Sequence, residues 1–326
     1  MTPQVFALEG SRPLGEAIAR ALGLELAAHE ERVFEDGEQK TRPLVDPAGA
    51  DVYVVHSLYG EPGRSAHDKL CTLLLFVATL RDHGAARVTA VVPYLAYARK
   101  DRRTKPFDPV TLRYLAQMFE AVGTDALITL EAHNVAALQN AFRCRTVHLE
   151  AHALFTPLAL ALAAGEPVAV ASPDPGGVKR AQLWREALEP AAARPVGFAF
   201  LDKRRSAGVL SGGNLVAGDV QGATVLLIDD LVSTGSTLAR SAASLRQAGA
   251  RRVIAFAAHG LFVQDAGEVL ATEALESVHV ADSVPPFRLE GSAARAKVRV
   301  VSCAALFADA IRACHQASAV AAQGAP

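Results

Sequence analysis

The run VLLIDDLVSTGST, residues 225–237, constrains the fold of this chain more than any other stretch. Its four apolar residues predict a buried strand, Asp229 and Asp230 follow at the carboxyl end, and helical periodicity begins at Ser236 after a Ser/Thr/Gly loop. Such a loop binds anions, because the backbone N–H groups and the positive end of the helix dipole both face it. The run therefore predicts an α/β protein with a phosphate site at this loop.

The two acids beside the loop indicate what else the ligand carries. Carboxylates repel a phosphate, so Asp229 and Asp230 suit the hydroxyls of an attached sugar, or a metal ion. An ordinary strand–turn–helix with two solvated turn acids is the alternative. The complete run resembles the phosphoribosyl-diphosphate (PRPP) loop of phosphoribosyltransferases and PRPP synthetases. That resemblance implies a ribose-5-phosphate site made of the two acids with Ser233, Thr234, Gly235, Ser236 and Thr237.

Composition excludes several classes of protein. The chain has 326 residues, 51% of them hydrophobic, and a net charge of −1, so nothing implies bulk attraction to nucleic acid or to an anionic membrane. The four cysteines are scattered without a C-x-x-C pair, which favours a reducing compartment over a disulfide framework or structural zinc. No apolar run reaches the roughly 18 residues of a membrane helix, and no export signal is visible at the N-terminus. We expect a cytoplasmic protein.

Predicted strands and helices alternate along the whole chain. The clearest strands cover residues 51–57, 87–92, 126–130, 167–171, 196–201, 252–258 and 297–301, and the clearest helices residues 67–83, 110–122, 178–188, 236–248 and 304–314. We also expect a short strand at 24–28, a helix at 268–275 and a mobile Gly/Ser-rich loop at 206–213. This alternation predicts βαβ units in two similar α/β domains of parallel sheets, with a seam near Glu150.

Five further polar clusters stand at predicted strand ends or turns, and each has an ordinary alternative. The basic residues between 99 and 105 form a solvated loop or, with the aromatic residues among them, a polyphosphate clamp. His133 by itself reads as a loop histidine, and Asp174 as a turn residue. Residues 203–205 alone read as surface charge, and residues 34–38 as a hairpin tip or capped turn.

Together these clusters resemble one family, the ribose-phosphate diphosphokinases or PRPP synthetases. The matching runs, in order, are FEDGE (34–38), VVPYLAYARKDRR (91–103), TLEAHN (129–134), SPDPGGVKRA (172–181), DKRR (202–205) and DDLVSTGST (229–237). The resemblance implies two phosphoribosyltransferase-like domains, each a mainly parallel sheet flanked by helices. The first comprises residues 1–150, on the ATP side, joined by the C-terminal helix 304–316, and the second residues 151–303 with the PRPP loop.

The resemblance also implies an activity and a role for each matching residue. The family transfers the β,γ-diphosphoryl group of ATP to the C1 hydroxyl of ribose 5-phosphate in a Mg²⁺-dependent reaction that yields PRPP and AMP. Lys203 and Arg205 match the catalytic cations of a closing loop, and His133 and Asp174 match the metal ligands. The implied ATP-binding residues are Phe34, Asp36, Glu38, Arg99, Lys100, Asp101, Arg102 and His133. The turn 34–38 would reach the adenine of a neighbouring subunit, so a dimer-based homo-oligomer such as a hexamer is expected.

Some positions depart from the family pattern. Ser233 stands where the loop usually has an acid, Lys100 replaces the usual Gln, and residues 131–134 replace D-L-H-A. These departures leave open a relative with another nucleotide donor or sugar-phosphate acceptor. A phosphoribosyltransferase would not need the first domain, and a non-catalytic regulatory subunit would tend to lose the catalytic cations, which are present here.

Overall fold

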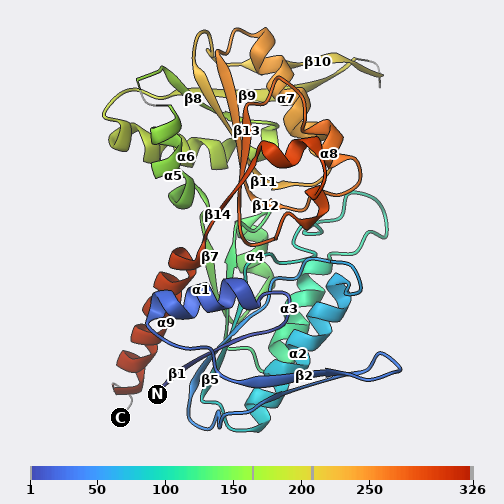
Figure 1. Cartoon of the computed structure of the whole chain (residues 1–326), viewed down its shortest axis with the longest axis vertical. Helices are drawn as coiled ribbons and strands as arrows, with labels where there is room; N and C mark the ends of the chain where they lie inside the picture. Colours follow the sequence, from blue (N-terminus) through green and yellow to red (C-terminus); the bar gives the residue numbers. More distant parts are fainter. Residues whose placement is uncertain (1, 164, 207–208, 324–326) are drawn as a thin grey trace. The chain divides into compact units, whose positions relative to one another are not determined.

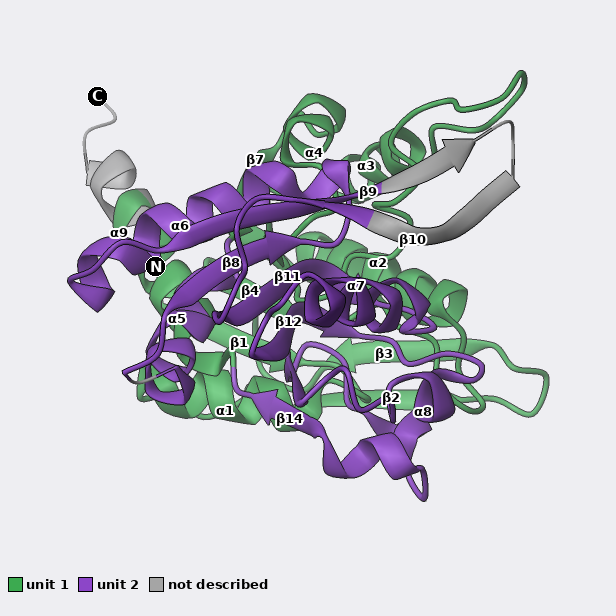
Figure 2. Cartoon of the chain, turned by 90° about the horizontal axis from the view of Figure 1, so that it is seen from above, with its two compact units in different colours: residues 1–149, 303–326 green, residues 150–302 purple. Residues whose placement is uncertain are grey.

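The computed structural model describes residues 2–163, 165–206 and 209–323, with the side chains of residues 203–214 and 318–323 left out. Figure 2 shows two compact units, one of residues 1–149 and 303–326 and one of residues 150–302. The division falls between Leu149 and Glu150, and the chain returns to the first unit at Cys303. No helix in the described part is both long enough and apolar enough to span a bilayer.

The first unit is built on a parallel sheet with strand order β1-β4-β5-β6-β7 (Figure 1). The strands are β1 (Pro3–Ala7), β4 (Asp51–Val55), β5 (Arg87–Val92), β6 (Ala126–Leu130) and β7 (Arg145–Leu149). The helices are α1 (Arg12–Leu22), α2 (Ala66–Asp82), α3 (Thr111–Ala121), α4 (Val135–Ala141) and α9 (Ala304–Gln323). Apolar residues of α2 and α3 share one core cluster with β4, β5 and β6, whereas α1 packs against α9.

A hairpin of β2 (His29–Val33) and β3 (Gln39–Pro43) forms a separate two-stranded sheet in this unit. Both figures show it projecting away from the main sheet. The expected strand at 24–28 was wrong: no strand covers those residues, and β2 begins after them.

The C-terminal helix α9 is fixed to the first unit through a fully buried carboxylate at the start of β4. Asp51 accepts hydrogen bonds from Arg87 Nε and Nη2, at 2.8 and 2.7 Å, and from the Tyr53 hydroxyl at 2.9 Å. His315 Nδ1 lies 2.6 Å from the same carboxylate, and the Arg87 guanidinium also donates to the Cys314 carbonyl at 3.2 Å. Because a buried carboxylate must be paired, this cluster favours the docked helix.

The second unit has a seven-stranded sheet in the order β10-β9-β8-β11-β12-β13-β14, parallel except for β10. The strands are β8 (Val168–Ser172), β9 (Gly197–Ser206), β10 (Val209–Ala217), β11 (Thr224–Val232), β12 (Arg252–Gly260), β13 (Ser277–Ala281) and β14 (Val298–Val301). The helices are α5 (His152–Leu162), α6 (Val178–Ala192), α7 (Ser236–Gln247) and α8 (Ala266–Val269). Trp184 of α6 packs edge-on against Phe256 of β12, with ring centroids 5.0 Å apart.

The predicted fold class, α/β with mainly parallel sheets flanked by helices, is confirmed. Two local predictions in the second unit were wrong. The helix expected at 268–275 is the short α8, and most of the loop expected at 206–213 belongs to β10, which pairs with β9. Residues 207–208 of that expected loop lie outside the described residues.

Candidate active site

The turn from β11 into α7 forms the clearest ligand-binding feature of the second unit. Strand β11 continues through both acids to Val232, so the loop is only residues 233–235, and α7 begins at Ser236 as expected. Gly235 adopts a left-handed φ of 78°, which an L side chain rarely takes, and a Cβ there would lie 2.7 Å from Leu270. Gly235, the N-cap residue, has no side chain to cap α7, and the Thr234 hydroxyl accepts from the Ser236 N–H at a long 3.4 Å, so the first-turn N–H groups face the loop.

The hydroxyls beside this turn add donors to the backbone N–H groups. Thr234 Oγ1 and Ser236 Oγ lie 3.0 Å apart, and the Ser233 carbonyl accepts from the Val263 N–H at 3.0 Å. Ser233, Thr234, Ser236 and Thr237 are all partly exposed. A phosphate placed here would meet hydroxyls and N–H groups, as the sequence predicts.

The acid pair before the turn is poised to take up positive charge or hydroxyl donors. Asp230 is buried, and the side chain of Asp229 is 20% exposed. Burial raises the pKa of Asp229 well above its usual value, and the neighbouring Asp230 carboxylate raises it further. Arg180, in the first turn of α6, places Nη1 3.9 Å from Asp229 Oδ1 and opposes that shift. A ligand cation or sugar hydroxyls would offset the same charge.

Sequence reasoning did not assign a role to Arg180. Arg180 lies inside the run SPDPGGVKRA. Its position in the first helical turn after a parallel strand could have indicated a place in the site. Side chains at that place stand at the carboxyl edge of the sheet, where open α/β sheets bind ligands.

Asp174 follows β8, the neighbour of β11, and the two predicted catalytic cations lie on β9, the next strand in the sheet. Asp174 follows β8, is partly exposed, and uses Oδ1 to accept from the Gly177 N–H at 3.1 Å. Strand β9, on the other side of β8, continues past its end and carries the backbone of Lys203 and Arg205. The side chains of Lys203 and Arg205 lie outside the described residues.

In the first unit, one hydrogen bond joins two predicted nucleotide-binding segments. Asn134 Nδ2 donates to Asp101 Oδ2 at 2.8 Å, which ties the loop after β5 to the segment after β6. Asn134 also caps α4 by accepting from the Ala137 N–H at 3.1 Å. His133 is exposed beside it. Arg99, Lys100 and Arg102 are exposed, and no ion pair holds them within the described part of the chain. These cations are available to a polyphosphate.

The remaining predicted residues lie at the tip of the β2–β3 hairpin. Phe34 is partly exposed, with the Arg32 guanidinium 4.7 Å from its ring centroid, and Asp36 Oδ1 accepts from the Glu38 N–H at 3.0 Å. Asp36 and Glu38 are exposed. The tip is therefore a closed turn with an aromatic ring and two carboxylates at its surface.

The side chains suit a magnesium ion bound in part by phosphate. Within the described residues no group of three or more His, Cys, Asp or Glu side chains could enclose a metal. Mg²⁺ usually binds through one or two carboxylates together with substrate phosphates and waters, so a closed protein cage is not required. Asp174 has a second carboxylate oxygen that its turn does not use. The raised pKa of Asp229 shows that its negative charge is disfavoured in the folded protein, and a bound cation would stabilise that charge.

Comparison with known proteins extends over nearly the whole chain. Residues 3–123 match the N-terminal domain of ribose phosphate pyrophosphokinase, and residues 213–322 match the phosphoribosyl synthetase-associated domain. A ribose-phosphate pyrophosphokinase of Caldanaerobacter subterraneus is 32% identical over 97% of this chain and 96% of its own length. Ribose-phosphate pyrophosphokinase 2 of Enterococcus faecalis is 33% identical over 96% and 93%. The crystal structure of phosphoribosylpyrophosphate synthetase from Mycobacterium smegmatis matches with a TM-score of 0.85, 30% identity, and coverage of 97% and 99%.

Proposed function

Because this chain belongs to the ribose-phosphate pyrophosphokinase family, we propose that it transfers the β,γ-diphosphoryl group of ATP to the C1 hydroxyl of ribose 5-phosphate. The products are PRPP and AMP. The observation that carries this proposal is the β11–α7 turn, where a left-handed Gly235 at the N-cap of α7 follows the strand that carries Asp229 and Asp230. A pentose with a 5-phosphate has both groups that this arrangement would bind.

In the proposed reaction the C1 hydroxyl oxygen attacks the β-phosphorus, the bond from that phosphorus to the α,β-bridging oxygen breaks, and AMP leaves. The hydroxyl proton passes to water. The protein's contribution is then position and charge. Asp229 and Asp230 hold the ribose hydroxyls, and the turn from Ser233 to Thr237 holds the 5-phosphate.

On the nucleotide side, Arg99, Lys100, Asp101 and Arg102 bind ATP together with His133 in this proposal. The Asn134–Asp101 hydrogen bond supports it, because that bond keeps the basic loop next to the histidine. Lys203 and Arg205 then neutralise the charge that builds up on the transferred group. Their strand extends past the end of β8, beside the turn that carries Asp174.

We propose Mg²⁺ as the cofactor, with His133 and Asp174 as the protein ligands. When bound, the ion neutralises phosphate charge and orders the triphosphate. A carboxylate suits this hard cation well and an imidazole suits it less, so the assignment of Asp174 is the better founded on donor chemistry.

We further propose a dimer-based homo-oligomer in which Phe34, Asp36 and Glu38 contact the adenine of a neighbouring subunit. The hairpin supports this proposal, since Asp36 and Glu38 at its tip are exposed and Phe34 is partly exposed. A reducing cytoplasm is the proposed location, and the four free cysteines are consistent with it.

The test is a product analysis with a panel of nucleotide donors and pentose phosphates in the presence and absence of Mg²⁺. AMP and PRPP should form in equal amounts from ATP and ribose 5-phosphate. Turnover with another donor or another pentose phosphate alone would replace the proposed substrates with those compounds. The panel includes them because Lys100 and residues 131–134 depart from the family pattern.

A further inference from the structure

In the described structure the β2–β3 hairpin, which carries the predicted ligand-binding tip, forms no ladder with the main sheet, and its two strands pair with each other. At its base the His29 ring packs on Phe6 of β1 and Phe76 of α2, with ring centroids 6.1 and 5.7 Å away. At its base, the backbone bonds in the described structure are those from the Ala27 N–H to the Val5 carbonyl, 2.8 Å, and from the Leu44 N–H to the Ala28 carbonyl, 2.8 Å. Side chains must therefore fix the direction in which the hairpin points.

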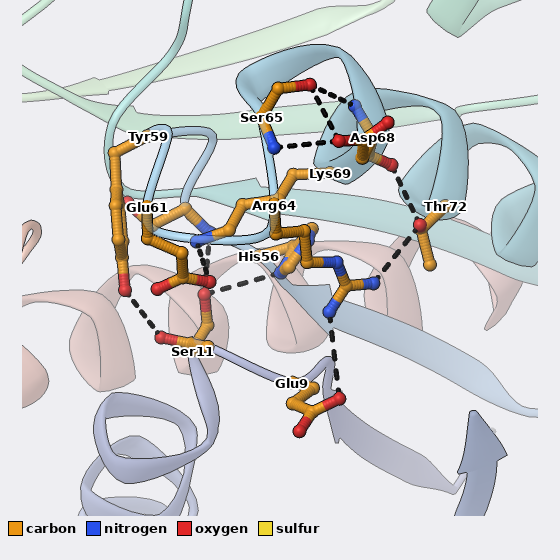
Figure 3. Close-up of polar contacts among 12 residues, drawn as sticks. Glu9, Ser11, His56, Tyr59, Glu61, Arg64, Ser65, Asp68, Lys69 and Thr72 are labelled. Atoms are coloured by element: carbon orange, nitrogen blue, oxygen red, sulfur yellow. Dashed lines mark hydrogen bonds and ion pairs between the residues drawn. The ribbon is translucent and has the colours of Figure 1, made fainter. Parts of the chain in front are cut away.

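One guanidinium reaches both strands of the hairpin and the helix behind it. Arg64, in the loop before α2, uses Nη2 to donate to Glu31 Oε2 at 3.2 Å, to Gln39 Oε1 at 3.3 Å and to Thr72 Oγ1 at 3.2 Å. Glu31 belongs to β2, Gln39 to β3 and Thr72 to α2. The Thr72 hydroxyl also donates to Gln39. Figure 3 shows Arg64 between Glu9 and Thr72.

Glu31, whose carboxylate accepts a hydrogen bond from Arg64, is largely buried. The side chains of Glu31 and Arg64 are 12% and 14% exposed. Burial alone would raise the pKa of Glu31, but hydrogen bonds from His29, the Glu9 N–H and Arg64 hold it at about 2. Since the carboxylate is ionised and desolvated, loss of its arginine would leave a buried charge less compensated.

Arg64 itself is held in a rigid loop. The backbone N–H and carbonyl of Arg64 exchange hydrogen bonds with Glu61, at 3.1 and 2.8 Å. Lys69, fully buried, lies 2.9 Å from the Glu61 carboxylate and 3.4 Å from the Tyr59 ring centroid. On the other side, Ser65 and Asp68 form the capping box of α2 (Figure 3). The guanidinium therefore starts from a fixed position.

We propose that Arg64 is a positioning residue that fixes the direction of the β2–β3 hairpin and so places the 34–38 turn for nucleotide binding. This inference rests on the proposed function for its kinetic consequence, and on the contacts above for its structural one. Each strand has five residues, so the tip stands about 17 Å from the base at about 3.3 Å per residue. A rotation of about 10° at the base would then move the tip by about 3 Å, enough to lose a ring contact.

The kinetic test compares Arg64→Ala with Arg64→Lys and with a control in the same hairpin, Arg42→Ala. Arg42 pairs with Glu30 across the two strands at 2.5 Å, is exposed, and makes no hydrogen bond or ion pair with α2 in the described structure. We expect Arg64→Ala to raise the KM for ATP about tenfold, the effect of losing one contact between the displaced tip and the nucleotide. The KM for ribose 5-phosphate should change less than about twofold, Arg64→Lys should recover part of the loss, and Arg42→Ala should match the wild type.

A second measurement does not depend on turnover. Two nitroxide labels are attached in a Cys144→Ser background, one to a new cysteine at the tip, Glu35→Cys, and one to the native exposed Cys71 on α2. The labelled chain is diluted with unlabelled chain, so that distances within one chain are measured. Pulsed electron–electron double resonance should give a narrow distribution of the distance between the two nitroxides in the labelled protein with Arg64 and in its Arg42→Ala variant. The distribution should be broadened or shifted in the Arg64→Ala variant. An unchanged distribution in Arg64→Ala would overturn the inference, as would equal increases in both KM values. If the wild type forms no PRPP, the proposed function fails while the distance measurement still decides the role of Arg64.

Discussion

Replacing Gly235 with alanine tests the phosphate-binding turn directly, because two separate penalties can be worked from its geometry. The residue has a φ of 78°, and the left-handed conformation costs an L residue about 1–2 kcal/mol. The new Cβ would lie 2.7 Å from Leu270 Cδ2 and Cγ, so a buried side chain must move at an overpacking cost of about 1–3 kcal/mol. The two terms sum to about 2–5 kcal/mol.

That free energy must appear either as lost stability or as a changed loop. Urea unfolding of Gly235→Ala should show a decrease of about 2–5 kcal/mol if the turn keeps its conformation. If the turn relaxes instead, the N–H groups no longer converge, and the KM for ribose 5-phosphate should rise about tenfold or more while the KM for ATP stays near the wild-type value.

Two controls separate strain from clash. Gly222 has a φ of 69° with nothing within 4 Å of a Cβ, so Gly222→Ala should cost only the strain, about 1–2 kcal/mol, and leave both KM values unchanged. Adding Leu270→Ala to Gly235→Ala should cost less than the two single changes together, by about 1–3 kcal/mol. A Gly235→Ala protein with the stability of Gly222→Ala and an unchanged KM for ribose 5-phosphate would show that this turn neither requires the glycine nor binds the 5-phosphate.

Three further predictions concern other parts of the two units. Lys203→Ala should lower kcat about 10²–10³-fold with little change in the KM for ATP, as expected for a group that acts on transition-state charge, and steady-state kinetics would contradict this by showing a raised KM at normal kcat. The pKa of Asp229 is raised on folding, so the folded state binds the proton more tightly and stability falls as pH rises from about 4 towards neutrality. Asp229→Asn should then be more stable than the wild type at pH 7, which urea unfolding at pH 5 and pH 7 would measure. A variant no more stable than the wild type at pH 7 would contradict this prediction. Asp51→Ala should destabilise the first unit by about 3–5 kcal/mol, because it leaves Arg87 uncompensated, and a thermal or urea shift worth under about 1 kcal/mol would contradict it.

Hydrophobic periodicity was sufficient to predict the two parallel sheets, but it could not show strands without an apolar face. The segments HEERV and QKTRP of β2 and β3 are mostly charged or polar, and they pair with each other outside the main core. Strand β10 contains two glycines and lies at the edge of its sheet, so its sequence resembles a loop. In each case the strand depends on a partner strand that the local sequence does not reveal.

The site shows a similar limit. The phosphate-binding turn could be predicted because its residues are contiguous and its chemistry follows from a strand, a small loop and a helix N-terminus. The roles of Arg64 and Lys69 could not, since a cation in a sequence normally indicates solvent exposure. Lys69 is fully buried because Glu61 and Tyr59 come from a loop that folds back over it, and that contact depends on tertiary structure.

The most direct test of the proposed reaction is to follow all phosphorus-containing species by ³¹P NMR while the purified protein acts on MgATP and ribose 5-phosphate. We expect the ATP signals to be replaced by those of AMP and of a diphosphate attached to C1 of the sugar, in equal amounts and only while Mg²⁺ is present. Release of ADP or free diphosphate, in place of AMP and the sugar diphosphate, would contradict the proposed reaction. So would ATP that is not consumed when the protein is folded and binds both substrates.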